Sequence, residues 1–308
     1  MEAPIPDLSP PESVRFSVVI LTYARDVALK TTLDRLEAAV EGRRDVEVIL
    51  VDNNVDGVDR THFLKPFAIS RLVATGENKG VSARNDGMAV ARGEIIALLD
   101  DDVLLETPDF LDRFGESFDS RPDVGVVNVR KLDGKTMTLL AECVPHTRKS
   151  IDTSKPFLTF RFIGGLVGLR RSVYQQLGGF SPDFFYGAEE REYSYRIIKA
   201  GWKIYFCPKI VAIETNDMGG RKPRAQQSTE VLLNTYVIAY LHKAWLTALI
   251  DVTLFTTLLV FKERGQIDVP GAIRRFFVWL RRPGHAKREP MDQRALGYIR
   301  ECGGATWR

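Results

Sequence analysis

Cysteine and histidine are scarce in this chain of 308 residues, which has three cysteines and four histidines. The cysteines are widely spaced, so they form neither a disulfide framework nor a zinc-binding pattern. The histidines show no metal-ligand spacing, and each is expected to be a surface or packing residue. These absences make a reducing, cytosolic setting the expected one. The residues concerned are Cys143, Cys207, Cys302, His62, His146, His242 and His285.

A phosphate-binding glycine motif is also missing. Neither Gly-x-Gly-x-x-Gly nor the P-loop pattern is present, which argues against a dinucleotide-binding or an ATP-hydrolysing fold. The first residues are rich in proline and lack the basic and apolar regions of a signal peptide. Residues 1–14 are therefore expected to be a disordered lead-in.

Long apolar runs and a strong net charge are absent as well. The run Val252–Phe261 has ten residues, whereas a membrane span needs about 20 and would have to include Asp251. The net charge is only +3, so no nucleic-acid partner is expected. However, the segment Lys262–Arg308 holds eleven Lys or Arg and five Asp or Glu. This basic tail suggests a membrane, a nucleic acid or an acidic neighbour as its partner, and of these we expect no nucleic acid.

The first hundred residues alternate between buried strands and helices. Apolar runs predict strands at 16–21, 46–51, 69–74 and 95–99. Helices are expected from Asp26, which can cap its helix, to about Val40, and from Val81 to about Ala91. This alternation predicts an α/β fold with a mostly parallel sheet and right-handed crossovers.

Polar residues follow each of these strands. Because ligands bind at the carboxyl ends of parallel strands, the clusters at 22–25, 52–54, 78–84 and 100–102 predict a nucleotide site. Three successive carboxylates, Asp100, Asp101 and Asp102, repel one another unless a cation such as Mg²⁺ or Mn²⁺ is bound. The alternative is a solvated acidic loop.

The remainder up to residue 214 predicts more strands and helices. Strands are expected at 124–129, 162–169, 203–207 and 210–213, with helices at 108–118 and 171–177 and an irregular stretch or hairpin at 131–159. Glu189 and Glu190 begin another helix, which reaches about Lys199. Glutamates are common at helix starts because the dipole favours anions. The alternative is that one of them is a general base at the rim of the pocket.

Several motifs together resemble the family 2 glycosyltransferases of the GT-A fold. The resemblance covers about Phe16 to Glu214. It is carried by residues 17–25, 51–54, 78–85, 99–102, 164–165, 178–180, 187–192, Arg196 and 200–201, in the order of the family. It implies a Rossmann-like sheet flanked by helices and an inverting transfer from a nucleotide sugar.

The resemblance also assigns roles to individual residues. It places Asp100 near the ribose, Asp102 on the metal and Asp101 in the nucleotide site without a metal-ligand role. It makes Glu190 the catalytic base and Glu189 an acceptor contact. The remaining nucleotide contacts are Thr22, Tyr23, Arg25, Asp52 (to the base edge), Asn78, Gly80 and Arg84, and acceptor contacts are expected at Gly164 and Gly165.

Two positions depart from the family pattern. Glu190 stands where many members have Asp, which lengthens the reach of the base by one methylene. Members often have a metal-binding His near the end of the last strand, where this chain has Glu214. Either Glu214 replaces the His as an oxygen ligand, or the metal site uses only Asp102 and water.

The last hundred residues are expected to form a helical extension. We predict a catalytic domain over 15–215 and an extension over 216–308, with an apolar, helical stretch between Gln226 and Phe261, of which Val231–Leu241 is expected to pack on the catalytic domain. Basic residues flank aromatic ones in Arg274–Arg282, which suits an interfacial helix on an anionic leaflet. Packing on a second subunit, as in a homodimer, is an equal alternative.

The predicted function is that of a metal-dependent, hexosyltransferase-like enzyme. Its donor would be a UDP-, GDP- or dTDP-linked sugar, its cofactor Mn²⁺ or Mg²⁺, and its acceptor a polysaccharide, a lipid-linked saccharide or a small glycoside. The protein would be cytoplasmic, with peripheral contact to the inner face of the membrane through its tail. The alternatives are a nucleotidyltransferase acting on a sugar phosphate and an inactive scaffold that binds nucleotide sugars.

Overall fold

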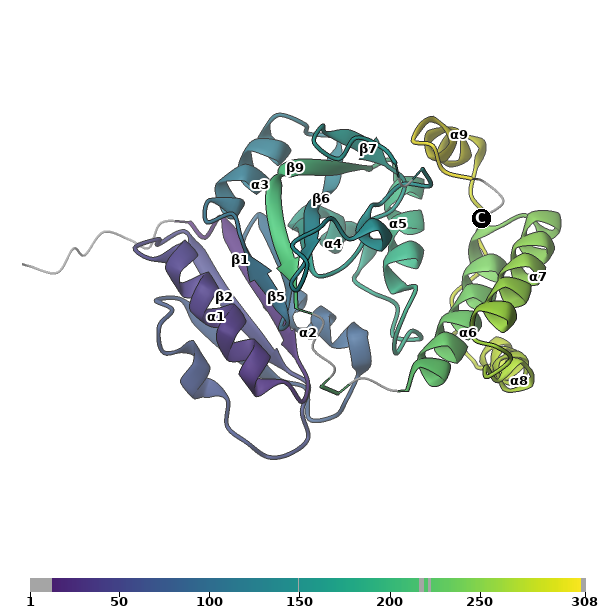
Figure 1. The fold of residues 1–308 in the computed structure, drawn as a ribbon, viewed down its shortest axis with the longest axis horizontal. Coiled ribbons are helices and arrows are strands. Elements are labelled where there is room, and N and C mark those ends of the chain that lie inside the picture. Colours follow the sequence, from purple (N-terminus) through teal and green to yellow (C-terminus); the bar gives the residue numbers. More distant parts are fainter. Residues whose placement is uncertain (1–12, 149, 216–218, 221–222, 306–308) are drawn as a thin grey trace, which may run out of the picture.

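The computed structural model describes residues 13–148, 150–215, 219–220 and 223–305. Most of the expected lead-in lies outside the described residues. A nine-stranded sheet runs through the catalytic part in the order β3-β2-β1-β4-β8-β6-β9-β5, and β7 pairs with β9. Helices cover the sheet, and a group of C-terminal helices lies to one side of it (Figure 1). The predicted mixed, mostly parallel α/β architecture is confirmed.

The first half of the sheet is parallel, as predicted. Its strands are β1 (Phe16–Thr22), β2 (Val46–Asp52), β3 (Ser70–Ala74) and β4 (Ile95–Asp100). The register pairs Thr22 with Asp52 and Leu21 with Asp100, so the polar strand ends meet at one edge.

The connections of this half differ in detail from the predictions. The prediction that Asp26 caps α1 (Asp26–Val40) is wrong, because Arg25 occupies the cap position and Asp26 pairs with Arg60 at 2.8 Å. The helix expected from Val81 consists of a 3₁₀ turn, η2 (Gly80–Ala83), and α2 (Arg84–Val90). A second 3₁₀ turn, η1 (Thr61–Leu64), precedes β3.

The second half of the sheet is mixed. β8 (Leu166–Arg170) is antiparallel to β4 and β6 (Val124–Asp133), and β9 (Lys203–Glu214) is parallel to β6. The short strands β5 (Val103–Leu105) and β7 (Phe157–Thr159) are antiparallel to β9. β8 begins four residues later than predicted, and the two strands expected at 203–213 are one.

Helices and a 3₁₀ turn complete this half. α3 (Phe110–Asp119), α4 (Arg171–Leu177) and α5 (Glu189–Lys199) lie close to their predicted positions. The stretch 131–159 contains the end of β6, the turn η3 (Ala141–Cys143) and β7.

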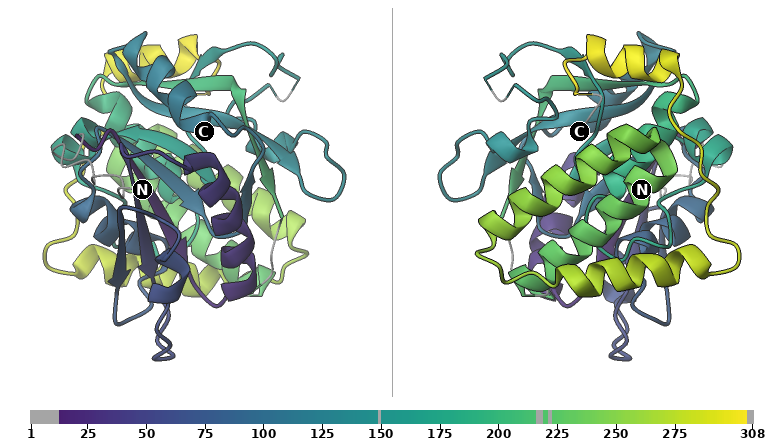
Figure 2. Two further views of the ribbon diagram at one scale, coloured as in Figure 1. Left: turned by 90° about the vertical axis from the view of Figure 1, so that its left-hand side faces the viewer. Right: turned by 90° about the vertical axis from the view of Figure 1, so that its right-hand side faces the viewer.

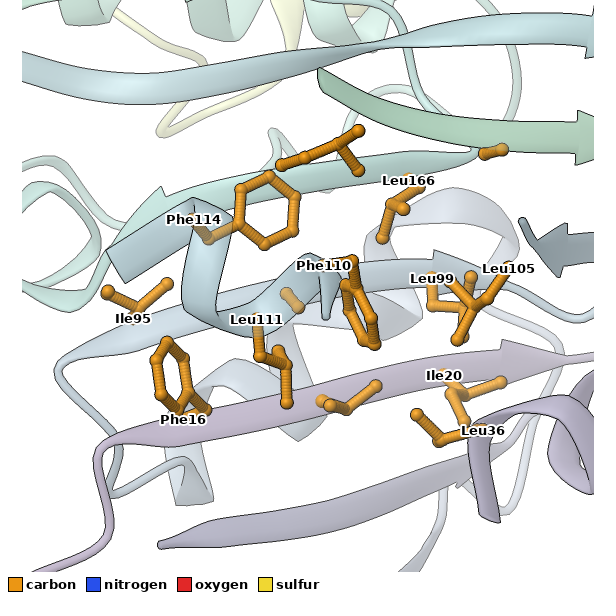
Figure 3. Packing of buried hydrophobic residues seen from close by; sticks show 14 of the residues in the cluster. Phe16, Ile20, Leu36, Ile95, Leu99, Leu105, Phe110, Leu111, Phe114 and Leu166 are labelled. Carbon is orange, nitrogen blue, oxygen red and sulfur yellow. The ribbon is translucent and has the colours of Figure 1, made fainter. Parts of the chain in front are cut away.

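Apolar side chains fill both faces of the sheet. One cluster joins β1, β2, β4, α1 and α3, and Figure 3 shows Phe110, Leu111 and Phe114 of α3 beside the strand side chains. Burying each large side chain of this kind contributes roughly 1.5–3 kcal/mol. A second cluster on the other face includes Tyr193 and Ile197 of α5 together with residues of the C-terminal helices.

The C-terminal helices are α6 (Arg224–His242), α7 (Trp245–Lys262), α8 (Val269–Arg281) and α9 (Gln293–Glu301). The apolar stretch predicted between Gln226 and Phe261 thus forms two helices. α6 packs into the second cluster through Val237, Ile238 and Leu241. α9 is joined to the sheet by the Tyr298 hydroxyl, which accepts a hydrogen bond from the backbone N–H of Ile204 at 3.0 Å. Figure 2 shows α6, α7 and α8 together on one face.

Candidate active site

A pocket of about 530 Å³ lies at the carboxyl ends of the parallel strands. Its walls come from both halves of the sheet, the start of α5 and the start of α6. Thr22 and Asp52 are not among the lining residues that the structure describes. The predicted site residues that line it are Tyr23, Arg25, Asn78, Gly80, Arg84, Asp100, Asp101, Asp102, Gly164, Gly165, Glu189, Glu190 and Glu214. A hollow of about 570 Å³ at the amino end of β2 contains none of these residues.

Asp101 and Asp102 share Arg25. Both carboxylates are almost completely buried. Arg25 Nη1 lies 3.0 Å from Asp101 Oδ1 and 3.1 Å from Asp102 Oδ2. Asp101 also accepts a hydrogen bond from Thr22 Oγ1 at 2.9 Å. Burial raises the pKa of Asp101 to about 6, although Arg25 and Thr22 oppose that shift. Asp101 thus has internal partners for both oxygens, and its expected place in the nucleotide site stays a prediction.

Asp100 points to a different partner. Its Oδ1 lies 2.5 Å from Arg84 Nη2, and the Arg84 side chain is mostly buried. Arg84 also contributes a positive field near Glu189 and Glu190. The structure therefore brings Arg84 and Asp100, predicted as separate nucleotide contacts, into one ion pair at the pocket wall.

Asp52 is held by an arginine that sequence reasoning missed. Arg60 is 2% exposed, and its guanidinium lies 3.3 Å from Asp52 and 2.8 Å from both Asp26 and Asp56. The other Asp52 oxygen accepts hydrogen bonds from the backbone and side chain of Asn54. The signal for Arg60 was weak, because a lone arginine in a loop gives no indication of the strand end that it reaches.

The loop after β3 is tied to β2 by two asparagines. Asn53 Nδ2 donates to Asn78 Oδ1 at 2.9 Å, and the backbone N–H of Lys79 donates to Asn53 Oδ1 at the same distance. Gly80 has a φ of +61°, and a Cβ at this position would lie 2.1 Å from the carbonyl oxygen of Phe185. Glycine is therefore required there, because the loop contacts the segment that leads to α5.

Glu189 and Glu190 begin α5 and face the pocket, as the motif predicts. Glu190 Oε1 accepts a hydrogen bond from the backbone N–H of Gly164 at 3.2 Å. Glu189 is 6% exposed, and its Oε2 has no hydrogen-bond partner among the residues that the structure describes. Burial, followed by the charge of Glu190, raises the pKa of Glu189 well above its usual range. The preceding Ala188 has a φ of +65°, a strained conformation of the kind that clusters at functional sites.

Lys131 is a second residue that sequence reasoning missed. Its side chain is 3% exposed and its ammonium lines the pocket, 3.8 Å from Glu214 Oε2. Each of the two adjacent glycines leaves room for one charged group. A Cβ on Gly164 would lie 2.7 Å from Glu190 Oε1, and one on Gly165 would lie 2.4 Å from Lys131 Nζ. The paired glycines thus let a carboxylate and an ammonium approach the same stretch of backbone.

The end of β9, which carries Glu214, is hydrogen-bonded to the backbone of the acidic cluster. The backbone N–H of Thr215 donates to the carbonyl oxygen of Asp102 at 3.1 Å. The Glu214 carboxylate, however, faces the Lys131 ammonium and lies 3.6 Å from Cys143 Sγ. In the described part of the chain, no three His, Cys, Asp or Glu side chains form a group that could hold a metal.

A divalent cation fits this donor set when it is held mainly by substrate. Mg²⁺ is usually bound by one or two carboxylates together with substrate phosphates, and Asp102 supplies such a carboxylate. Each of the two candidate carboxylates already faces a cation, because Arg25 lies 3.1 Å from Asp102 and Lys131 lies 3.8 Å from Glu214.

Other motif residues have structural tasks. Asn85 Nδ2 donates a hydrogen bond to the carbonyl oxygen of Phe180 at 2.7 Å, and Asn85 Oδ1 accepts one from the backbone N–H of Phe180 at 2.8 Å. Arg196 joins Glu192 to the carbonyl oxygens of Leu177 and Gly179. These contacts fix the start of α5, and therefore Glu189 and Glu190, relative to the sheet.

Comparison with known families places most of the site in one family. A model described as "Glycosyl transferase family 2" matches residues 17–178. A second one, described as the N-terminal domain of galactosyltransferase, matches residues 146–218. The two matches together include the acidic cluster and the start of α5.

Individual proteins give a consistent result. The chain is 24% identical over 294 residues to an N-acetylglucosaminyl-diphospho-decaprenol L-rhamnosyltransferase of Mycobacterium tuberculosis. The match covers 84% of this chain and 94% of that protein. It is 26% identical over 189 residues to human polypeptide N-acetylgalactosaminyltransferase 10, covering 53% of this chain and 31% of that protein.

Solved structures share the fold. The mannosyltransferase PcManGT from Pyrobaculum calidifontis, in complex with GDP-Man and Mn²⁺, has a TM-score of 0.59 and 19% identity, and the match covers 96% of this chain and 86% of that one. GalNAc-T7 with UDP, GalNAc and Mn²⁺ has a TM-score of 0.61 and 16% identity, with 86% and 57% coverage.

Proposed function

We propose that this chain, which belongs to glycosyl transferase family 2, transfers one sugar to an acceptor hydroxyl with inversion at the anomeric carbon. The chain is a glycosyltransferase that uses a nucleotide-sugar donor. The observation that supports the finer proposal is the meeting of Glu190, Lys131 and Asp102 around one pocket. A base, a cation and a carboxylate suited to a divalent metal are the groups that such a displacement needs.

Glu190 is the proposed general base. The N–H of Gly164 orients its carboxylate at the pocket wall. When Glu190 takes the proton of the acceptor hydroxyl, that oxygen bonds to the anomeric carbon. The bond from this carbon to the diphosphate breaks, and its electron pair leaves with the nucleoside diphosphate. A single displacement of this kind inverts the configuration.

Glu189 is the proposed acceptor contact. Its raised pKa favours a protonated carboxyl group at neutral pH. A neutral carboxyl can donate a hydrogen bond to an acceptor oxygen, and it avoids a second negative charge beside Glu190.

Lys131 and Asp102 are proposed to act at the leaving group. The buried Lys131 ammonium is a fixed positive charge in a site of low dielectric, where it stabilises a departing diphosphate more strongly than in water. Mn²⁺ or Mg²⁺ would be held by Asp102 and the donor diphosphate, and it would neutralise developing negative charge. Both arrangements that the sequence allows, with and without Glu214, are retained, because Arg25 faces Asp102 just as Lys131 faces Glu214.

The relatives suggest classes of substrate. One relative is named for rhamnosyl transfer to a lipid diphosphate saccharide, and one solved structure holds GDP-mannose with Mn²⁺. We therefore propose a UDP-, GDP- or dTDP-linked hexose as donor and favour a lipid-linked saccharide as acceptor. Such an acceptor would place the enzyme on the inner face of a membrane.

The two alternative functions have less support from the site. A nucleotidyltransferase needs a basic group near the N-terminus to activate phosphate, but Arg25 is paired with Asp101 and Asp102. Neither that activity nor a scaffold function gives a task to the two glutamates at the start of α5.

Calorimetry with UDP-, GDP- and dTDP-sugars, with and without Mn²⁺, tests donor and metal together. We expect binding of one nucleotide class to strengthen with Mn²⁺, and transfer or donor hydrolysis to stop with EDTA. Asp102→Ala should abolish the Mn²⁺ effect on binding. Glu190→Gln should lose about 10²–10⁴-fold in turnover while donor binding is retained.

The matched control is Glu116→Gln, an exposed glutamate on α3, which should leave turnover unchanged. Near-full activity of Glu190→Gln would remove it as the base, and an unchanged Mn²⁺ effect in Asp102→Ala would remove that residue from the metal site.

A further inference from the structure

Two C-terminal helices present an exposed apolar surface, which we call the α7–α8 face. It is defined by Trp245, Leu249, Leu258 and Phe261 on α7 and by Phe277 and Val278 on α8. These side chains are between 48% and 78% exposed. Monomeric soluble proteins rarely expose contiguous apolar surface of this kind, and where they do it usually marks an interaction site.

The one acidic residue of α7 is buried against the protein. Asp251 is 4% exposed and its carboxylate lies 2.7 Å from Lys243 Nζ, whose side chain is equally buried. The outer side of α7 therefore carries no charge between Trp245 and Phe261. The sequence-based objection to a membrane span, the cost of Asp251, does not bear on contact between the outer side of α7 and a membrane surface.

α7 is long and apolar enough to cross a membrane. Its 18 residues have a mean hydropathy of 1.6, and 17% of them are buried inside the protein. Its inner side, however, is attached to the protein. Tyr236 of α6 and Thr256 of α7 join their hydroxyls at 3.0 Å, and Leu259 packs in a cluster with α6 and α8. A helix with one side packed and one side bare and apolar suits the plane of an interface rather than a span.

Unpaired cations border the α7–α8 face. Lys262, Arg264, Arg274 and Arg281 are exposed and have no ion-pair partner within the described ranges. The local acidic groups are engaged: Glu230 pairs with Arg275, Asp183 with Arg282 and Glu263 with Arg224, and Asp268 caps α8 through the N–H of Gly271. The uncompensated charge around the face is therefore positive, which complements an anionic leaflet.

We propose that the α7–α8 face rests on the surface of a bilayer that contains anionic lipids. Figure 2 shows α6, α7 and α8 on one side of the molecule, and residues Gln227 and Val231 of α6 line the pocket. The pocket is thus separated from the face by one helix. If the proposed function holds, a lipid-linked acceptor can keep its lipid in the membrane while its saccharide reaches Glu190. Binding to the bilayer itself does not depend on that function.

Vesicle sedimentation of the full chain, without substrate, tests the proposal. We expect binding to vesicles of phosphatidylcholine with 30% phosphatidylglycerol, and weaker binding at high salt, because screening reduces the attraction. Arg274→Gln/Arg281→Gln should reduce the partition coefficient by roughly 30-fold. Leu249→Gln/Leu258→Gln should abolish binding. The matched control, Val55→Gln/Val58→Gln, changes two exposed valines on a distant loop and should bind like the wild type.

Three results would overturn the proposal. They are no binding to any vesicle, equal binding by wild type and Leu249→Gln/Leu258→Gln, and a dimer in light scattering that this variant dissociates while vesicles stay unbound. The last would assign the face to a second copy of the chain. Glu190→Gln should bind vesicles like the wild type, so loss of transfer and loss of membrane binding can be told apart.

Discussion

The two walls of the pocket differ in how far their charged side chains are paired. On the wall built by the parallel strands, each carboxylate has a fixed cationic partner: Asp52 has Arg60, Asp100 has Arg84, and Asp101 has Arg25. On the opposite wall, Glu189 Oε2 has no partner among the described residues, and Lys131 lies 3.8 Å from its counter-ion. The first wall is organised before a donor arrives, whereas the second keeps groups available for the reaction.

This difference has an energetic meaning. Buried ion pairs hold geometry and become costly only when one partner is removed. Buried groups without partners are costly in the resting protein, and such costs are concentrated at functional sites. Apart from Asp102, the proposed metal ligand, mutations on the first wall should therefore affect mainly stability, and mutations on the second wall mainly turnover.

Arg60→Ala should have the largest effect on the first wall. It leaves the buried Asp52 carboxylate without its cation, so we expect the free energy of unfolding to fall by about 3–5 kcal/mol. Urea denaturation measures this loss. Arg113→Ala removes an arginine from a surface pair with Asp109 on α3 and should cost at most about 1 kcal/mol. A similar small loss in both variants would contradict the view that Arg60 organises this wall.

Lys131→Met should have the largest effect on turnover after loss of the base. The variant keeps an apolar chain of similar length but removes the charge at the leaving group, so we expect kcat to fall by about 10²–10³-fold. The unfolding midpoint should change little by comparison. Lys135→Met, in the exposed turn after β6, is the control. Unchanged kcat with weaker donor binding would make Lys131 a binding residue only.

Gly164→Ala tests the space that Glu190 requires. The added methyl would lie 2.7 Å from Glu190 Oε1, so the carboxylate must move away from the acceptor. A displacement of this kind can cost about 10²-fold in kcat, and donor affinity should be retained. Gly178→Ala is not an equivalent control because its φ is +70°. Gly297→Ala on α9, where a Cβ meets nothing within 4 Å, should leave kcat unchanged.

Glu189→Gln should have a smaller effect than the three substitutions above. It should change the free energy of unfolding, and the sign of that change depends on pH. Because the folded-state pKa of Glu189 is raised, the folded protein loses stability as pH rises from the unfolded value of about 4.3 through the folded pKa. The variant lacks this loss, so at pH 9 we expect it to be more stable than wild type by about 1–3 kcal/mol. Denaturant midpoints at pH 5 and pH 9 measure the difference.

Glu192→Gln, one turn further along α5, should change the free energy of unfolding in the opposite direction. Burial alone would raise the pKa of Glu192, but hydrogen bonds from His242 and Arg196 hold it below its usual range. Its charge therefore stabilises the folded state above the unfolded pKa, and the variant should be less stable at neutral pH. If both glutamine variants change stability in the same direction, the assignment of paired and unpaired glutamates is wrong.

Much of the fold could be predicted because its signals are local. Apolar runs of five or six residues and the polar residues after them define β1, β2 and β4, and the strand rule places their ends at one edge. The predicted bounds of elements were wrong where strand pairing or helix packing with other parts of the chain sets them. β8 starts only at Leu166 because residues 162–165 lie outside the ladder with β4, and the tail divides into α6 and α7 at Lys243 and Ala244.

The sequence by itself determined the family, the parallel half of the sheet and the acidic cluster at its edge, since each depends on neighbouring residues and on helix or strand periodicity. Only the tertiary structure decided which charges are paired. Arg60 reaches Asp52 through a loop, Lys131 meets Gly165 across 34 residues of sequence, and Asp251 turns inward to Lys243. Such contacts depend on how loops turn back and on which way side chains point once the elements pack, and neither leaves a periodic pattern in the sequence.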